Sequence, residues 1–581
     1  MVIRDRSANG WVTFELLNSQ PRVMCKSVVS TLFRNGSVWA GVPGQPSTDA
    51  LLVTDGAIVA VGPDAVAEAP ESSDIVDLQG GFLMPSFGDG HAHPLLGGLE
   101  FVGPAVRPCT SVDEIVAAVR RYAEDHPDQE WIVGASYDGS LATDGLFDAR
   151  WLDAAVADRP VVLRAWDYHT VWCNTAALER AGITADTPDP ALGEIPHRPD
   201  GSVLGTLREW GAVDLVTAVM PARDEEVRLA ALGTAADYYL AHGVTWVQDA
   251  WVEPGDVQTY LEAARRGALR VRFNLALYAD PRHFDDQVAH FADAHRQVSE
   301  LGSPMLTAQT VKFFADGVVE NETGALLQPY CSGLHSHSRG QERSDSGENH
   351  GMTVWEGHSL ARACQRVDEL GLQIHIHAIG DAAVRQALDA IEYTVAQNGP
   401  RDRRPVIAHV QLVDDDDLDR FAALGVIPCM QPLWAQEDAL MNVLTVPRLG
   451  RERADKQYRM RSLAESGAAL ALGSDWPVSS GAPLDGIAVG VSRQTAEGEP
   501  AGGWTPQETL AIERALAAYT TGVADQAFAE AIWGRLAPGA SADLVWLERD
   551  PRSTPPLELP GIGVRATYLR GEPGFVAATS P

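Results

Sequence analysis

Short apolar segments alternate with segments of helical periodicity through the middle of this chain, and this alternation constrains the fold more than any other feature. The apolar segments lie at 131–134, 161–164, 244–248, 271–275, 311–314, 373–377, 406–409, 426–429 and 469–473. Helical periodicity is found at 112–124, 224–241, 382–397 and 418–424. Strands that alternate with helices indicate a parallel sheet of βα units. Their number predicts an α/β fold, an eight-stranded (β/α)8 TIM barrel with additional material.

The two ends of the chain are predicted to build one small β-sandwich domain together. Residues 28–84 contain short strands separated by Asn-Gly and Asp-Gly pairs, which are typical of hairpins. Residues 534–581 repeat this style, so the barrel is expected over residues 85–533. The stretch from about 101 to 240 is too long for one strand-to-helix connection, and we expect an inserted subdomain there.

Two segments fit neither unit. Residues 1–27 match no repeating pattern and are predicted to be an N-terminal extension. Residues 331–351 are rich in Ser, Gly and charge and include His335 and His337 in a His-x-His spacing. Because no apolar strand surrounds them, we interpret this segment as a loop rather than a metal site, and a lid is one role that the sequence leaves open.

Composition narrows the classes of partner. The formal net charge of -34 argues against nucleic acid and against an anionic membrane surface as partners. No apolar run is long enough to span a membrane, and the first residues lack the apolar stretch of a signal peptide. The six cysteines show no CxxC spacing, which favours reduced thiols and a cytoplasmic location. We therefore expect a small-molecule substrate, and a homodimer is an assembly that the sequence leaves open.

Lysine is scarce in this chain, and one of its three lysines stands in an apolar strand. Lys26 and Lys456 lie elsewhere, whereas Lys312 lies in the apolar segment 306–316. Burying an isolated charge is costly, so the chain has no evident reason to keep a lysine there for its charge alone. A neutral lysine amine can react with CO2 to give a carbamate, whose two oxygens can bridge two metal ions. A buried lysine that pairs with a carboxylate is the ordinary alternative.

Further metal-ligand residues stand at the ends of other apolar strands. His91 and His93 are spaced as i and i+2, so both face the same side of a strand. His377, His409 and Asp475 each come near the end of a later strand, and the C-terminal ends of barrel strands meet at one mouth. His375 would lie one layer deeper. Neutral imidazoles suit zinc, and such a centre lowers the pKa of water to give a nucleophile that Asp475 can orient and deprotonate.

In the motifs that hold these residues, the chain resembles the amidohydrolase superfamily, and more narrowly its YtcJ-like branch, in which N-substituted formamide deformylase is the best known activity. The stretches that carry the resemblance are residues 80–93, 168–178, 182–190, 201–209, 311–317, 377–383 and 472–478. The resemblance covers roughly residues 28–575 and departs from the usual pattern at Ser86, where a glycine is common. It implies a TIM barrel, a zinc centre of one or two ions (other divalent metals remain open) and six ligand positions: His91, His93, Lys312, His377, His409 and Asp475.

Candidate substrate contacts are less sharply defined. Trp172, Trp434 and Trp476 lie near motif ends and could form an aromatic site, with core packing as the alternative. His169 and Asn174 could reach over the metals from the insert to polarise a carbonyl oxygen, which would make His169 catalytic beside Asp475 and Lys312. Glu320 follows the lysine strand and is either a substrate contact or a helix cap.

Three functions remain in competition. The first is a metal-dependent amidohydrolase that cleaves a C–N bond outside peptides by a metal-activated hydroxide, with N-substituted formamides as the favoured substrates. The second uses the same site on a cyclic amide, a carbamate or an ester. The third is a catalytically silent regulatory protein with the same fold, which would have no need of Asp475.

Overall fold

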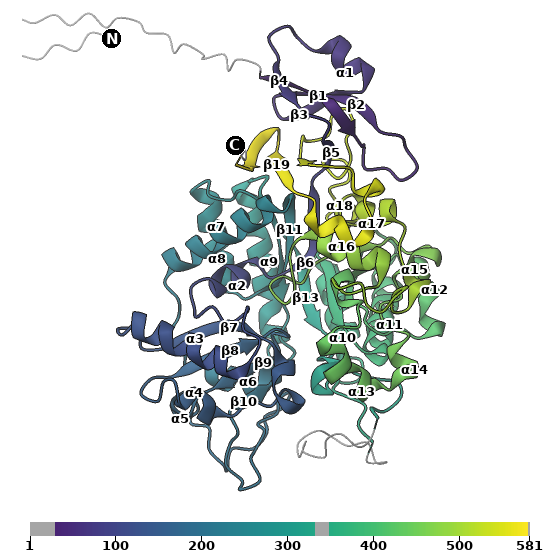
Figure 1. The fold of residues 1–581 in the computed structure, drawn as a ribbon. Helices are drawn as coiled ribbons and strands as arrows, with labels where there is room; N and C mark the ends of the chain where they lie inside the picture. Colours follow the sequence, from purple (N-terminus) through teal and green to yellow (C-terminus); the bar gives the residue numbers. More distant parts are fainter. Residues whose placement is uncertain (1–28, 332–347, 579–581) are drawn as a thin grey trace, which may run out of the picture.

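The computed structural model describes residues 29–331 and 348–578 (Figure 1). The predicted extension at residues 1–27 therefore lies outside the described residues. So does most of the predicted loop at 331–351, including His335 and His337.

Eight parallel strands form the centre of the molecule and confirm the predicted TIM barrel. In sheet order they are β6 (Phe87–Ala92), β11 (Val244–Val252), β12 (Arg272–Tyr278), β13 (Leu306–Phe314), β14 (Gln373–Ala378), β15 (Val406–His409), β16 (Ile427–Met430) and β17 (Ala471–Leu472). The last strand returns to the first, because Asp475 N donates to His91 O at 2.7 Å and His93 N donates to Trp476 O at 2.7 Å. These two bonds nearly close the barrel.

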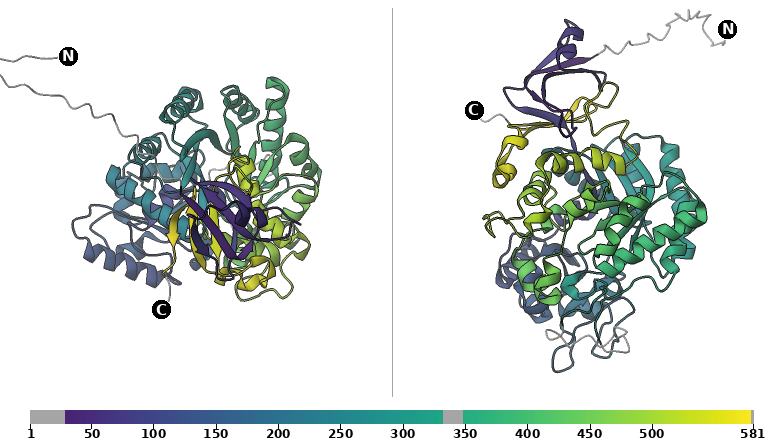
Figure 2. Two further views of the ribbon diagram at one scale, coloured as in Figure 1. Left: turned by 90° about the horizontal axis from the view of Figure 1, so that it is seen from above. Right: turned by 90° about the vertical axis from the view of Figure 1, so that its right-hand side faces the viewer.

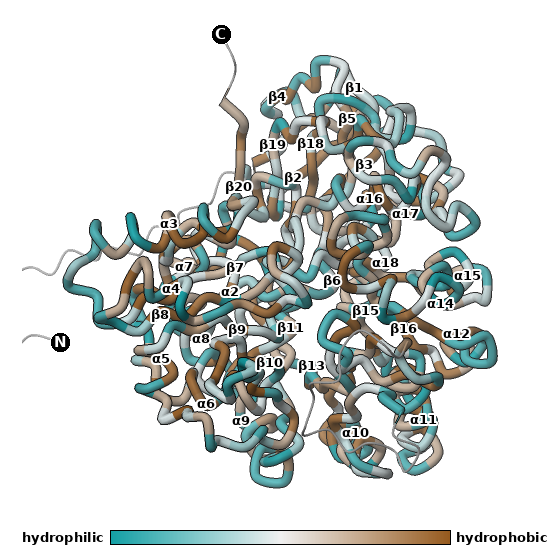
Figure 3. Tube along the Cα trace, turned by 60° about the horizontal axis from the view of Figure 1, so that its bottom comes forward, coloured by the Kyte–Doolittle hydropathy of each residue, from teal (hydrophilic) through white to brown (hydrophobic). Residues whose placement is uncertain are grey.

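Helices cover the outside of the barrel, as the alternating pattern predicts. They include α7 (Glu225–Ala241), α8 (Asp256–Arg265), α9 (Phe284–Leu301), α10 (Ser359–Glu369), α11 (Asp381–Asn398), α12 (Leu418–Leu424) and α16 (Pro483–Ser492). The strands are largely buried and mostly apolar, whereas hydrophilic residues are frequent along the outer parts of the molecule (Figure 3). None of the helices in the described part of the chain is long and apolar enough to cross a membrane.

A second sheet lies between β6 and β11 in the sequence. It contains β7 (Ile132–Tyr137), β8 (Val161–Ala165), β9 (Thr170–Cys173) and β10 (Thr206–Arg208), with the order β10-β9-β8-β7. The helices α3 (Val112–Asp125), α4 (Ala149–Asp153), α5 (Thr175–Arg180) and α6 (Glu209–Thr217) pack around it. This unit, which we call the insert, lies beside the barrel at the lower left of Figure 1.

The third sheet combines strands from both ends of the chain, and Figures 1 and 2 show them side by side at one end of the barrel. Its order is β20 (Glu572–Val576), β19 (Val564–Leu569), β18 (Leu544–Leu547), β5 (Phe82–Pro85), β1 (Ser30–Val38), β2 (Thr48–Thr54) and β3 (Ala57–Val61), with β4 (Asp74–Asp77) also pairing with β1. The expected sandwich is thus one continuous sheet, in which Phe33, Leu51 and Tyr568 share a core.

One predicted turn in this sheet is wrong. Asn35-Gly36 does not reverse the chain, because β1 continues to Val38 and only its register shifts between Arg34 and Val38. A Cβ on Gly36 would lie 2.6 Å from Gly81 O, so the glycine permits close packing instead of a hairpin. Asp55-Gly56, by contrast, does form the turn between β2 and β3.

Candidate active site

The six residues proposed as ligands come from five strand ends and line one cavity of about 330 Å³. They are His91 and His93 at β6, Lys312 on β13, His377 on β14, His409 at the end of β15 and Asp475 just after β17. All lie toward the C-terminal ends of the parallel strands, where barrel folds place their chemistry. The barrel therefore brings together all six, although they span nearly 400 positions of the chain.

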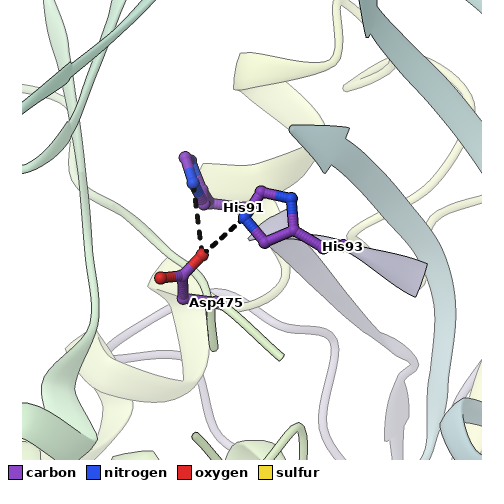
Figure 4. A group of neighbouring side chains, drawn as sticks. All are labelled: His91, His93 and Asp475. Atoms are coloured by element: carbon purple, nitrogen blue, oxygen red, sulfur yellow. Dashed lines mark ion pairs between the residues drawn. The ribbon is translucent and has the colours of Figure 1, made fainter. Parts of the chain in front are cut away.

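Two histidines and one carboxylate are the most tightly grouped of these ligands (Figure 4). Asp475 Oδ1 lies 3.0 Å from His93 Nε2 and 3.4 Å from His91 Nε2. All three side chains are buried. Oδ1 of Asp475 thus faces two imidazole nitrogens, and it has no further hydrogen-bond partner among the described residues.

Lys312 lies against this group without a carboxylate of its own. Its Nζ is 3.3 Å from His91 Nε2 and 4.5 Å from the centre of the Phe314 ring. Within the described chain, no ion pair joins it to a carboxylate, so the structure lacks the pairing that would give it an ordinary structural role. Burial lowers the pKa of the Lys312 amine to about 7, so much of the amine would be neutral near neutral pH, the form that reacts with CO2.

Neighbouring groups fix which nitrogen of His377 and His409 points inward. His377 Nε2 lies 3.1 Å from Gly317 O, a carbonyl that can only accept, so Nδ1 keeps its lone pair. His409 Nδ1 lies 2.8 Å from Gln431 Oε1, which leaves Nε2 as the free nitrogen. The two rings are 4.6 Å apart. Buried acceptors around ligand histidines commonly set their tautomers in this way.

A deeper layer supports His91. Its Nδ1 lies 2.7 Å from His375 Nε2, and His375 does not line the cavity, which agrees with the deeper position expected from its place in the strand.

Asp89 holds the turn where the barrel closes, accepting from Ser474 N at 2.9 Å and from Ser474 Oγ at 2.5 Å. Asp475 itself has φ 58, a left-handed conformation that is costly for a non-glycine residue.

The donor set fits a divalent metal ion. Burial lowers the pKa of His91, His93 and His377 below the usual histidine range, and burial lowers that of His409 to about 3. Burial alone would raise the pKa of Asp475, but its contact with His93 outweighs this and lowers it. Neutral imidazoles beside an ionised carboxylate are the forms that bind zinc and similar ions.

The insert contributes one more imidazole to the cavity. His169, just before β9, lies with its ring 5.4 Å from that of His377. Its Nδ1 is 2.8 Å from Glu209 Oε2. Burial alone would lower the pKa of His169, but the Glu209 carboxylate raises it above the usual value. The structure thus places this predicted catalytic residue in the same cavity as the six proposed ligands.

The remaining predicted substrate contacts divide into two groups. Trp434 lines the cavity and stacks on His409 at 5.3 Å, and Glu320 lines it with one oxygen 2.6 Å from Thr445 Oγ1. The other three side chains, Trp172, Asn174 and Trp476, are not among the residues that line the cavity.

Each of those three has a packing role instead. Trp172 is buried in the core of the insert, where its Nε1 donates to Asp148 O. Asn174 caps α5 by accepting from Ala177 N and is buried with four hydrogen bonds. Trp476 stacks on Tyr238 at 4.8 Å. Proximity to a motif in sequence therefore does not by itself bring a side chain to the cavity.

These placements predict opposite effects for two tryptophans. Trp434→Ala should raise KM about 5- to 30-fold through the loss of about 1–2 kcal/mol of contact, with little change in stability. Trp172→Ala should lower the free energy of unfolding by about 3–5 kcal/mol and leave KM of the folded protein unchanged. Denaturant unfolding and steady-state kinetics on both variants, with metal content measured, check the pair. A rise in KM for Trp172→Ala would contradict this assignment.

Three residues that support the site, Asp89, Glu209 and Gln431, were not predicted from the sequence. Asp89 lies within the motif 80–93 and Glu209 ends the stretch 201–209. The sequence therefore marked both residues as parts of motifs but did not indicate their roles. Gln431, the partner of His409, follows the apolar segment 426–429 and carries no signal that its sequence position reveals.

A parallel barrel whose strand ends hold histidines, a lysine and an aspartate defines the class of metal-dependent barrel hydrolases. The family model described as "Amidohydrolase family" matches residues 74–575. The chain therefore belongs to the amidohydrolase family, and it is a metal-dependent hydrolase of that superfamily.

Several known proteins resemble the chain over most of its length. Protein LONG AFTER FAR-RED 3 of Arabidopsis thaliana is 30% identical, covering 94% of this chain and 91% of that protein. Putative amidohydrolase YtcJ of Bacillus subtilis is 27% identical, covering 94% and 99%. N-substituted formamide deformylase of Arthrobacter pascens is 27% identical, covering 90% and 94%. These matches confirm the resemblance to the YtcJ-like branch.

A solved structure supports the fold. An uncharacterized metal-dependent hydrolase from Pyrococcus horikoshii OT3 superimposes with a TM-score of 0.69 at 24% identity, covering 91% of this chain and 99% of that chain.

Proposed function

We propose that this protein hydrolyses a non-peptide amide C–N bond, with N-substituted formamides as the favoured substrates. The observation that carries the proposal is the convergence of His91, His93 and Asp475 beside Lys312 in a cavity that His169 also lines. The 27% identity to N-substituted formamide deformylase supports the choice of substrate class.

The proposed ligands are those six strand-end residues, with zinc as the favoured ion and a carbamate on Lys312 as an additional anionic ligand. A divalent ion held there would polarise the carbonyl group and lower the pKa of water. Asp475 would take the proton of the attacking water and pass it to the leaving nitrogen. The bond that forms joins water oxygen to the acyl carbon, and the bond that breaks releases the amine.

His169 would donate a hydrogen bond from Nε2 to the carbonyl oxygen, where negative charge develops. Its Nδ1 is engaged with Glu209, so Nε2 is the nitrogen available to the substrate. His169 and Asp475 thus act on different atoms of the scissile amide.

The apolar part of the cavity suits an amide with an apolar substituent. Trp251, Phe314, Leu433, Trp434, Leu440, Met441 and Leu444 line it. A formyl group is the smallest acyl group, so it needs little room beside the ligands, and the apolar walls would hold the larger substituent on nitrogen. The same walls would also accept a cyclic amide, a carbamate or an ester, which form the second candidate class.

A substrate panel tests the proposal. The metal-loaded protein should release p-nitroaniline from p-nitroformanilide and amine from N-benzylformamide, and the corresponding acetamides should be turned over more slowly. A preference for cyclic amides, carbamates or esters over both formamides would move the substrate to the second class. Metal-loaded protein without turnover of any panel member would favour the silent regulatory role.

A further inference from the structure

Glu209 is a buried residue of the insert to which the proposed mechanism gives no role, and it makes two hydrogen bonds with His169. His169 precedes β9 and Glu209 begins α6 directly after β10, and β9 and β10 pair with Thr170 opposite Arg208. Glu209 N donates to His169 O at 2.7 Å, while the side chain turns back so that Oε2 lies 2.8 Å from His169 Nδ1. Glu209 is 1% exposed and adopts φ 61. A charged side chain so deeply buried requires partners.

The other oxygen of Glu209 reaches the barrel. Oε1 accepts from Thr323 Oγ1 at 2.5 Å and lies 3.4 Å from Asn321 Nδ2, both in the loop that follows β13. A Cβ on Gly317 in this loop would lie 2.7 Å from Glu209 Oε1 and 2.2 Å from Thr323 Oγ1, so a glycine leaves room for the contact. Gly317 O is the acceptor of His377 Nε2. One carboxylate thus touches both the insert imidazole and the loop that orients His377.

We propose that Glu209 is a positioning residue that holds His169 with Nε2 toward the scissile carbonyl, so that the insert completes the active site. This inference rests on the proposed function, because it assigns His169 the carbonyl oxygen as its target. Packing supports the orientation: the His169 ring lies 4.9 Å from the Trp210 ring and 6.0 Å from the Phe314 ring. The competing explanation is that Glu209 only fastens the insert to the barrel.

A double-mutant cycle on kcat separates the two explanations. Glu209→Ala should lower kcat about 10- to 100-fold, as loss of a partner that orients a site imidazole does, with KM changing little. In a His169→Ala background the same substitution should change kcat by less than about threefold, because the residue it positions is gone. Glu209→Gln, which keeps an acceptor for Nδ1–H, should recover much of the loss. Equal losses in both backgrounds would overturn the proposal in favour of a fastening role.

Structural readouts keep the test independent of activity. In a crystal structure of metal-loaded Glu209→Ala, the His169 ring should turn from its position while His91, His93 and Asp475 stay in place. An unmoved ring would overturn the proposal. The control is Asp148→Asn, which removes a carboxylate that pairs with Arg198 inside the insert, away from the cavity. It should leave kcat unchanged, and a loss as large as that of Glu209→Ala would again indicate a fastening role.

The positioning role of Glu209 and the proposed substrate class can be rejected independently of each other. If the wild-type protein turns over an ester or a cyclic amide instead of a formamide, the cycle is run with that substrate, since His169 faces the carbonyl in each case. If the effects of Glu209→Ala and His169→Ala on kcat are non-additive with such a substrate, the positioning role of Glu209 is supported and the formamide assignment is rejected. If no substrate is turned over, the position of the ring in the Glu209→Ala crystal structure decides.

Discussion

Asp475→Asn should lose turnover by roughly 10²–10⁴-fold, the usual cost of removing a general base, and further because a metal ligand is weakened. The fold should persist, because asparagine has the same shape and the backbone bond from residue 475 to His91 O remains. One amide oxygen can still face His91 and His93, so much of the metal should stay bound. Steady-state kinetics with metal analysis of the same samples checks both parts.

The outcome that contradicts this assignment is near-normal turnover with metal bound. The base would then be another group, and His169 would be the first to test. Asp485→Asn serves as a control, since Asp485 accepts from Ser480 Oγ nearby and lies outside the ligand set. It should leave turnover within about twofold, the scatter of substitutions away from special features.

Lys312→Ala should lose both metal and activity, because it removes the amine that would carry the bridging carbamate. Short carboxylic acids such as acetate or propionate should restore part of the activity by placing a carboxylate where the carbamate stood. The chain supplies a matched control in Lys456→Ala, since Lys456 is an exposed lysine whose amine lies 3.8 Å from Asp415. That variant should keep full metal content and turnover.

The modification itself can be observed directly. Metal-loaded protein prepared with ¹³C-labelled bicarbonate should show a carbamate carbon signal by NMR that is absent from Lys312→Ala. A metal-loaded structure with an unmodified Lys312 amine paired to a carboxylate would refute the bridge and favour a one-metal site.

The barrel and the convergence of the six proposed ligands could be predicted from the sequence because strand ends in a parallel barrel converge. A ligand residue at the end of an apolar strand, such as His409 or Asp475, is therefore placed by the topology alone. The spacing of His91 and His93 also specifies one face of one strand. These arguments need only the local sequence and the direction of the strands.

Contacts that depend on how separate units pack could not be predicted in this way. Trp172 and Asn174 stand close in sequence to His169, yet their side chains point into the insert while His169 faces the cavity. Glu209 reaches His169 only because β9 and β10 pair and the insert docks on the loop after β13. Likewise, Asn35-Gly36 signals a turn locally, but pairing of β1 with β5 carries the strand onward. A cytoplasmic location remains a prediction from the cysteine pattern, and the sequence leaves a homodimer open.

The most direct test of the account is activity as a function of bound metal. The purified protein is stripped with a chelator, then titrated with zinc while metal content and release of p-nitroaniline from p-nitroformanilide are measured on the same samples. The account predicts that stripped protein is inactive and that turnover rises in proportion to zinc bound, saturating at one or two ions per chain. Undiminished turnover by metal-free protein would contradict it.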